Sequence, residues 1–152
     1  MARNALGIAS RDGIVYSWWA NGSDTYMYRN NAYTGDLLDA AEWQTSSGTL
    51  LTWVDQSISF NTQMAIGASK IGIVSQNDGT GLNIRLITRS TGATASTTVI
   101  DATTTGQCTD ICADASDNFY VVWQIPAGVR RLSKYNSSGV LGWTLTGSTQ
   151  LY

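Results

Sequence analysis

The fold of this chain is indicated first by one short stretch, Ala115-Ser116-Asp117-Asn118-Phe119-Tyr120-Val121. Small residues lead into a tight turn, and a strongly apolar segment follows. Two earlier stretches have the same order of residue types: Ala9-Ser10-Arg11-Asp12-Gly13-Ile14-Val15-Tyr16 and Ala68-Ser69-Lys70-Ile71-Gly72-Ile73-Val74-Ser75. A pattern that returns at roughly fifty-residue intervals predicts an internal structural repeat.

Each copy is followed by a polar hairpin and a third segment that ends at a turn glycine: Tyr33-Thr34-Gly35, Ser90-Thr91-Gly92 and Ser137-Ser138-Gly139. We therefore expect one domain, residues 1–152, that contains three degenerate repeats at about 5–45, 64–100 and 108–146. The period is typical of four-stranded propeller blades. Residues 46–53 echo residues 137–143, which predicts an extra strand or a duplicated hairpin in the first repeat.

Turn signals and β-forming segments alternate along the whole chain. Leu82-Asn83-Ile84-Arg85-Leu86-Ile87 alternates apolar with polar residues, the period of a strand with one buried face. No segment carries a sustained helical stripe between a cap and a stop signal. These patterns predict an all-β fold of about three antiparallel, four-stranded, propeller-blade-like sheets. A β-sandwich or jelly-roll-like domain is the alternative.

The composition argues against several classes of function. Charged residues make up 13% of the chain and the net charge is −2, so no basic stripe is available for nucleic acid. No apolar run approaches the roughly twenty residues of a membrane span, and no signal-peptide pattern follows Met1. We expect a protein without nucleic-acid or membrane partners that is made in a bacterial cytoplasm and is not secreted.

The chain lacks several residue types on which common catalytic sites depend. The chain has no histidine, which removes Ser-His-Asp and Cys-His systems, and Glu42 is its sole glutamate. We considered Asp110, Asp114 and Asp117 as calcium ligands, but their spacing does not follow the calcium-loop pattern. Asp114 and Asp117 are also the pair that an Asp-only hydrolase would use. We predict no enzyme activity, no metal and no cofactor.

The two cysteines, Cys108 and Cys112, are separated by four residues. In an extended strand this places their Cα atoms about 13 Å apart, which is too far for a disulfide. We predict two packed, unreactive free thiols.

Aromatic residues gather on the predicted hairpin of residues 18–28, and the candidate binding surface consists of Trp18, Trp19, Tyr26 and Tyr28. Adjacent residues of a strand face opposite sides, so Trp18 and Trp19 cannot both point into one core. Two interpretations remain open. Either both faces of this sheet are buried, or Trp19, Tyr26 and Tyr28 form the stacking platform of a carbohydrate-binding, lectin-like module.

The third repeat resembles the bacterial β-propeller-type repeat. The resemblance rests on Asp114-Ala115-Ser116-Asp117-Asn118-Phe119-Tyr120-Val121-Val122 and on Leu132-Ser133-Lys134-Tyr135-Asn136-Ser137-Ser138-Gly139-Val140-Leu141-Gly142-Trp143. Trp43 is the candidate closing aromatic of the first repeat, and the second repeat lacks one. Similar repeats occur in bacterial surface proteins and in virion proteins of tailed phages, and the Gly-, Ser-, Thr- and Asn-rich composition is similar to the latter.

Three blades are too few to close a propeller, which needs about four to eight. Unpaired strand edges invite other chains, so we expect copies of the protein, or other virion proteins, to complete the fold. The sequence therefore predicts a non-enzymatic structural protein located in a phage virion, as a capsid-decoration or tail accessory protein, and a homo-oligomer. The alternative partner is a glycan.

Overall fold

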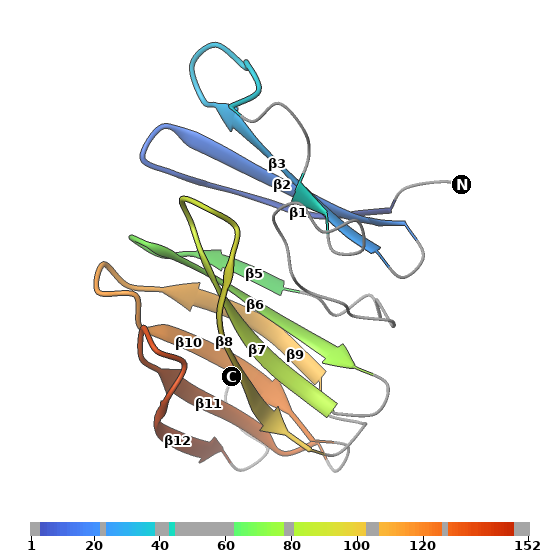
Figure 1. Cartoon of the computed structure of the whole chain (residues 1–152). Helices are drawn as coiled ribbons and strands as arrows, with labels where there is room; N and C mark the ends of the chain where they lie inside the picture. The colour runs from blue at the N-terminus through green and yellow to red at the C-terminus, as the bar shows by residue number, and fades with distance from the viewer. Residues whose placement is uncertain are drawn as a thin grey trace.

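The computed structural model describes residues 4–21, 24–38, 43–44, 63–77, 81–102, 107–125 and 128–147. Every regular element in these ranges is a β-strand, so the all-β prediction is confirmed. The strands form three antiparallel sheets of four strands each (Figure 1).

Each sheet is a meander whose strands follow one another in chain order. The sheets nearly coincide with the three predicted repeats, while residues 46–53 lie outside the described ranges. The first sheet contains β1 (Asn4–Arg11), β2 (Ile14–Asn21), β3 (Asp24–Asn31) and β4 (Trp43–Gln44). The second contains β5 (Gln63–Ile66), β6 (Lys70–Asn77), β7 (Gly81–Thr88) and β8 (Thr94–Asp101). The third contains β9 (Gln107–Ala113), β10 (Phe119–Gln124), β11 (Arg130–Tyr135) and β12 (Leu141–Gly147).

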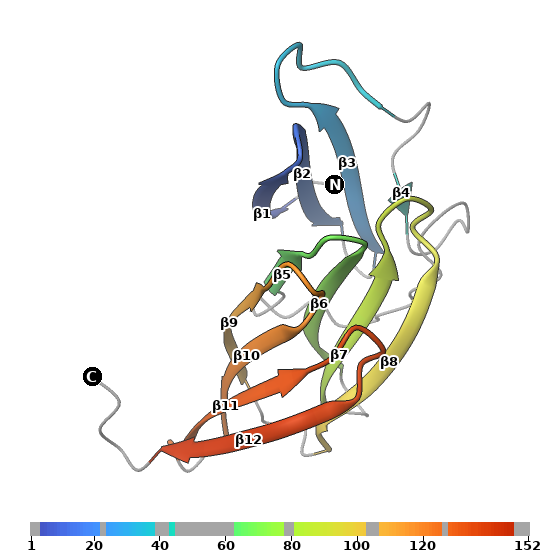
Figure 2. The same cartoon turned by 90° about the vertical axis from the view of Figure 1, so that its left-hand side faces the viewer.

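The three sheets are stacked with the second sheet in the middle (Figures 1 and 2). The first strands of neighbouring sheets lie side by side, β1 against β5 and β5 against β9. The last strands, β4, β8 and β12, form the opposite edges of the three sheets. Figure 2 shows that the sheets fan out from the β1–β5–β9 side and that the stack does not close into a ring.

The middle sheet is buried on both faces because alternate residues of its strands enter two separate cores. In β6, Ile71 and Ile73 pack toward the first sheet, whereas Val74 packs toward the third. A sheet covered on both faces is expected to have nearly continuous apolar strands, as in the stretch Ile71–Val74 of β6. In β7 the alternation of apolar and polar residues predicted one buried face, but the polar residue Asn83 is buried too, so that prediction is wrong for this strand. The first core contains Tyr16, Trp18, Met27, Met64, Ile66, Ile71, Ile73 and Ile87. The second contains Ala65, Val74, Leu82, Ile84, Leu86, Cys108, Ile111, Phe119, Val121, Trp123 and Tyr135.

The turn after the third strand has a comparable form in all three sheets. Gly35, Gly92 and Gly139 have φ values of 77°, 72° and 78°, a conformation that glycine adopts without strain. Their N–H groups donate to the carbonyls of Asn31, Thr88 and Asn136 at 2.9, 2.8 and 2.8 Å, respectively. The turn glycines quoted from the sequence therefore occupy equivalent places in the three sheets.

The second repeat differs from its sequence alignment at the first turn. Ile71-Gly72 stands opposite the turn residues Asp12-Gly13 in the comparison of the repeats, but β6 begins at Lys70 and the chain turns at residues 67–69. Ile71 is completely buried in the first core. Burial of this side chain favours the strand at a position where the neighbouring glycine suggested a turn.

Gly72 sets the distance between the second and third sheets. A Cβ atom at Gly72 would lie 2.5 Å from Cδ1 of Phe119, a residue that is itself completely buried. The ring therefore packs directly on the backbone of β6. Because the Phe119 ring is enclosed on all sides, it cannot move aside for a methyl group on residue 72.

We predict that Gly72→Ala lowers the free energy of unfolding by about 1–3 kcal/mol because it overpacks this contact. Urea denaturation followed by tryptophan fluorescence measures the change. The control is Gly142→Ala in β12, where a Cβ would meet its nearest neighbour at 3.5 Å. Equal stability of the two variants would contradict the close approach.

Candidate functional site

The outer face of the third sheet, which points away from the rest of the stack, is the candidate functional site. Val122 of β10 pairs with Asp110 of β9 and with Leu132 of β11, and Leu132 pairs with Leu145 of β12. Directly paired residues of antiparallel strands lie on the same face, so these four form one row across the sheet. A second row on that face consists of Cys112, Tyr120, Lys134 and Trp143. We call these eight residues the outer face.

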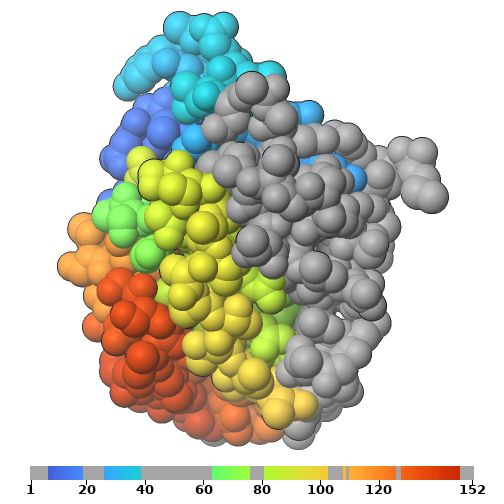
Figure 3. Space-filling model, viewed as in Figure 1, coloured from blue at the N-terminus to red at the C-terminus, as the bar shows by residue number. Residues whose placement is uncertain are grey.

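The outer face exposes apolar side chains. Val122 is 37% exposed, Trp143 40% and Leu145 60%. The rings of Tyr120 and Trp143 lie 6.2 Å apart, and Nζ of Lys134 lies 5.7 Å from the centre of the Tyr120 ring. In Figure 3 the atoms of the third sheet, orange to red, form the lower left end of the surface.

The outer face is hollowed only slightly. A shallow cavity of about 70 Å³ is lined by Asp110, Ile111, Cys112, Tyr120, Val122 and Leu132. Pockets for small organic ligands typically measure 300 Å³ or more. This surface is therefore better suited to an extended apolar partner, such as another sheet, than to a small molecule.

Asp117 ties the third sheet to the second. Its carboxylate accepts hydrogen bonds from the backbone N–H of Ser69 at 3.0 Å, from the Ser69 hydroxyl at 2.7 Å and from the backbone N–H of Lys70 at 3.3 Å. Asp117 is 6% exposed and has a φ of 58°, which aspartate tolerates better than most residues. This carboxylate serves a contact between sheets.

Asp114 closes the turn between β9 and β10. Its carboxylate accepts bonds from the backbone N–H of Ser116 and Asn118, both at 2.9 Å, from Nδ2 of Asn118 at 2.8 Å and from the Tyr120 hydroxyl at 3.1 Å. Asp110 accepts from the N–H of Ile111 at 2.8 Å. The three aspartates thus bond separate groups, and within the described ranges no three His, Cys, Asp or Glu residues are placed to share a metal ion.

We predict a loss of stability in acid that depends on Asp114. Hydrogen bonds, above all from the Asn118 side chain, lower the pKa of Asp114 from 3.8 to about 2. The unfolded chain binds this proton at the higher pH, so the stabilisation is complete above about pH 4 and disappears as the pH falls toward 2. Asp114→Asn, which cannot ionise, should reduce this dependence.

The measurement is the thermal midpoint between pH 7 and pH 2 for the wild type and for Asp114→Asn. The wild type should lose its excess stability over the variant in the acid range. Parallel curves for the two proteins would show that these hydrogen bonds do not favour the ionised carboxylate.

The aromatic residues of the first hairpin differ in how far they are buried. Trp18 is 3% exposed and lies in the first core, facing the second sheet. Tyr26 is 6% exposed, whereas Tyr28 is partly exposed. Trp18 and Tyr26 therefore do not belong to an exposed aromatic surface, because burial removes them from contact with a ligand. Trp19 pairs with Tyr26 in the strand register, but its side chain lies outside what the structure describes, so its role as a stacking residue stays a prediction.

Both cysteines are free, but only one is packed. Cys108 is 4% exposed, and burial raises the pKa of its thiol to about 12. Cys112 is exposed on the outer face, so the prediction of two packed thiols is wrong for this residue. The register of β9 against β10 shifts between Asp110 and Cys108, a β-bulge that places the two cysteines on opposite faces.

The outer face was not recognised in the sequence. One signal was present: Leu141, Trp143 and Leu145 alternate with small or polar residues, as in a strand with one apolar face. A bulge in β12 breaks that regularity, because Leu141 pairs with Tyr135 on the inner face whereas Trp143 pairs with Lys134 on the outer face. The alternation alone would have assigned all three residues to one face.

Comparisons with known proteins identify a similar fold. No family model and no curated protein matches the chain. The chain is similar to the crystal structure of the uncharacterized protein lmo1340 from Listeria monocytogenes EGD-e, with a TM-score of 0.55 and 14% sequence identity. The similarity covers 91% of this chain and 38% of that protein, so the chain spans less than half of its length.

A likeness at this level of identity bears on the fold alone. In the described part of the chain there is also no helix that could span a membrane.

Proposed function

We propose that this chain is a non-enzymatic assembly protein that docks a second copy of itself on the outer face of its third sheet. One observation carries the proposal: the internal faces of the stack are buried, while the last sheet exposes Val122, Trp143 and Leu145 on a nearly flat surface. Contiguous apolar surface of this kind marks interaction sites in soluble proteins.

A second copy suits this face because the chain already contains the matching geometry twice. The second sheet receives the first on one face and the third on the other. In a head-to-tail arrangement, the outer face would receive the first sheet of the next copy in the same way. On the side of the first sheet that faces away from the second, Ile8 is 72% exposed, and it shares a row with Ser17 and Tyr28.

Two copies joined at both ends would stack six sheets in a ring. Six lies within the range of about four to eight blades at which propellers close. We therefore include in this proposal that each sheet is one blade of a propeller shared by two copies. An open chain of copies would leave a first sheet uncovered at one end and an outer face uncovered at the other, whereas a closed dimer covers both with two identical contacts.

The energetics favour the closed form. Burial of a partly exposed apolar side chain contributes about 1–2 kcal/mol, so one contact supplies only a few kcal/mol from Val122, Leu132, Trp143 and Leu145. Association itself costs roughly 4–15 kcal/mol. Closure forms two contacts for a single association cost, and for this reason we expect dimers in preference to longer open chains.

We predict that the wild type is a dimer by size-exclusion chromatography with light scattering, and that Leu145→Asp weakens dimerisation at least tenfold because it buries a charge in the contact. The control is Leu141→Asp, which changes the same residue type in the same strand on the opposite face. Leu141→Asp should remain a dimer.

Cys112 gives a second readout of the same contact. Alkylation with iodoacetamide should be slow for the wild type at high concentration and fast on dilution or in Leu145→Asp. Buried Cys108 should react only after denaturation. A wild-type monomer at high concentration with a freely reactive Cys112 would overturn the proposal, and so would equal effects of the two aspartate variants.

We further propose that the assembly belongs to the virion of a tailed phage, as a capsid-decoration or tail accessory protein. The support is the resemblance of the third repeat to repeats of virion proteins, together with the low content of charged residues. We predict that the gene lies among portal, capsid or tail genes. A gene neighbourhood of metabolic enzymes would contradict the virion proposal and leave self-assembly to be judged by the dimer measurements.

A further inference from the structure

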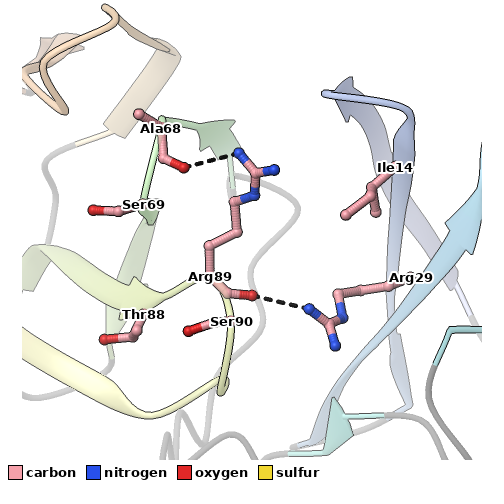
Figure 4. A pocket seen from close by; sticks show the side chains of 7 residues that line it. All are labelled: Ile14, Arg29, Ala68, Ser69, Thr88, Arg89 and Ser90. Carbon is pink, nitrogen blue, oxygen red and sulfur yellow. Dashed lines mark hydrogen bonds between the residues drawn. The ribbon is translucent and has the colours of Figure 1, made fainter.

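A cleft separates the turn ends of the first and second sheets. Its volume is about 370 Å³, at the lower end of the range for small-molecule pockets. All of its lining residues are at least partly exposed, so a solute can reach them. The first sheet contributes Ile14 and Arg29, and the second contributes Ala68, Ser69, Thr88, Arg89 and Ser90 (Figure 4).

Positive charge is concentrated at this cleft. The whole chain has nine Lys and Arg residues and a net charge of −2. Arg29 and Arg89 line the cleft, and Nζ of Lys70 lies 3.2 Å from Oγ1 of the lining residue Thr88. Arg11 is held nearby, with Nη1 donating to the carbonyl of Ile66 at 3.2 Å.

Two carboxylates of the described residues lie beside these cations. Asp12 lies at the rim, 2.8 Å from Nη1 of Arg89 and 3.7 Å from Nε of Arg11, and its side chain is 64% exposed. Asp117 already accepts bonds from Ser69 and Lys70. Among the described residues, Arg11, Lys70 and Arg89 outnumber these two carboxylates, so positive charge is in excess at the cleft although the chain is negative as a whole.

The Arg89 guanidinium is fixed before any ligand arrives. Its Nη1 donates to the carbonyls of Ala68 at 2.9 Å and Gly67 at 3.1 Å, in addition to the pair with Asp12. Figure 4 shows its other nitrogens on the side toward Ile14, across the cleft. Arg29 donates from Nη1 to the backbone carbonyl of Arg89 at 3.1 Å, so the two arginines are held next to each other. Prior ordering of this kind reduces the entropy lost on binding.

We propose that this cleft binds a small anionic molecule, a phosphate- or carboxylate-bearing compound of about the size of a monosaccharide. A guanidinium matches the two oxygens of either group. Ser90 brings a hydroxyl to the cleft, and the Thr88 hydroxyl, which accepts a bond from Lys70, can still donate one; the Ser69 hydroxyl donates to Asp117. Ile14 supplies an apolar wall. The site is independent of the outer face, which belongs to the third sheet.

The test is isothermal titration calorimetry of the wild type with inorganic phosphate, glucose 6-phosphate, glucuronate and glucose. The phosphorylated or the carboxylated sugar should bind at least tenfold more tightly than glucose, and added sodium chloride should weaken the binding. The two charged sugars distinguish the phosphate source from the carboxylate source. Equal affinity for glucose, or no binding of any charged probe, would overturn the proposal.

Arg29→Gln should reduce the affinity for the better anion at least tenfold. Arg130→Gln on β11 is the matched control, because it removes the same charge from the third sheet. Ser90→Ala, at an exposed turn residue, serves if Arg29→Gln does not fold, and it should weaken binding about threefold or more. Equal anion affinities of the Arg130 variant and the cleft variant would show that binding depends on the overall charge of the protein. That result would contradict a specific binding site in the cleft.

Discussion

The structure depends on the burial of both faces of the middle sheet. The side chains of β6 alternate between two cores, with Ile71 and Ile73 packing toward the first sheet and Val74 toward the third. Gly72 allows Phe119 to lie on the backbone of β6. A period of two residues thus joins three sheets into one stack. Among the described residues, the same period leaves Val122, Trp143 and Leu145 of the third sheet exposed on its outer face, and this face is the basis of the proposed assembly.

Polar contacts at the turn ends fix how neighbouring sheets sit on one another. Asp117 of the third sheet accepts hydrogen bonds from three donors of the second, and Asp12 of the first pairs with Arg89 of the second. Apolar packing alone is not directional, so these bonds select one alignment of the sheets. The chain has few charged residues, and several of them, including Arg29, Lys70 and Arg89, lie around the cleft between the first and second sheets. Residues that align the sheets therefore also lie at the proposed anion-binding cleft.

Two β-bulges decide which side chains reach the outer face. The bulge in β9 sends Cys108 into the core and Cys112 to the surface. The bulge in β12 places Leu141 and Trp143 on opposite faces of the third sheet. Each bulge adds one residue to a strand and inverts the alternation beyond it. The chemistry of the outer face, with Tyr120, Trp143 and Leu145 together, follows from these two interruptions.

The sequence by itself determined the class of fold, because turn glycines and apolar segments such as Phe119–Val122 are local signals with local causes. It also indicated three related units, which correspond to turns closed by Gly35, Gly92 and Gly139. Only the tertiary structure decided which apolar residues are buried, because Trp18 and Trp143 both lie in β-strands but Trp18 faces a neighbouring sheet and Trp143 is exposed. It likewise brought Arg29 and Arg89 together from separate repeats. Contacts between sheets depend on stacking and on bulges, and neither leaves a regular period in the sequence.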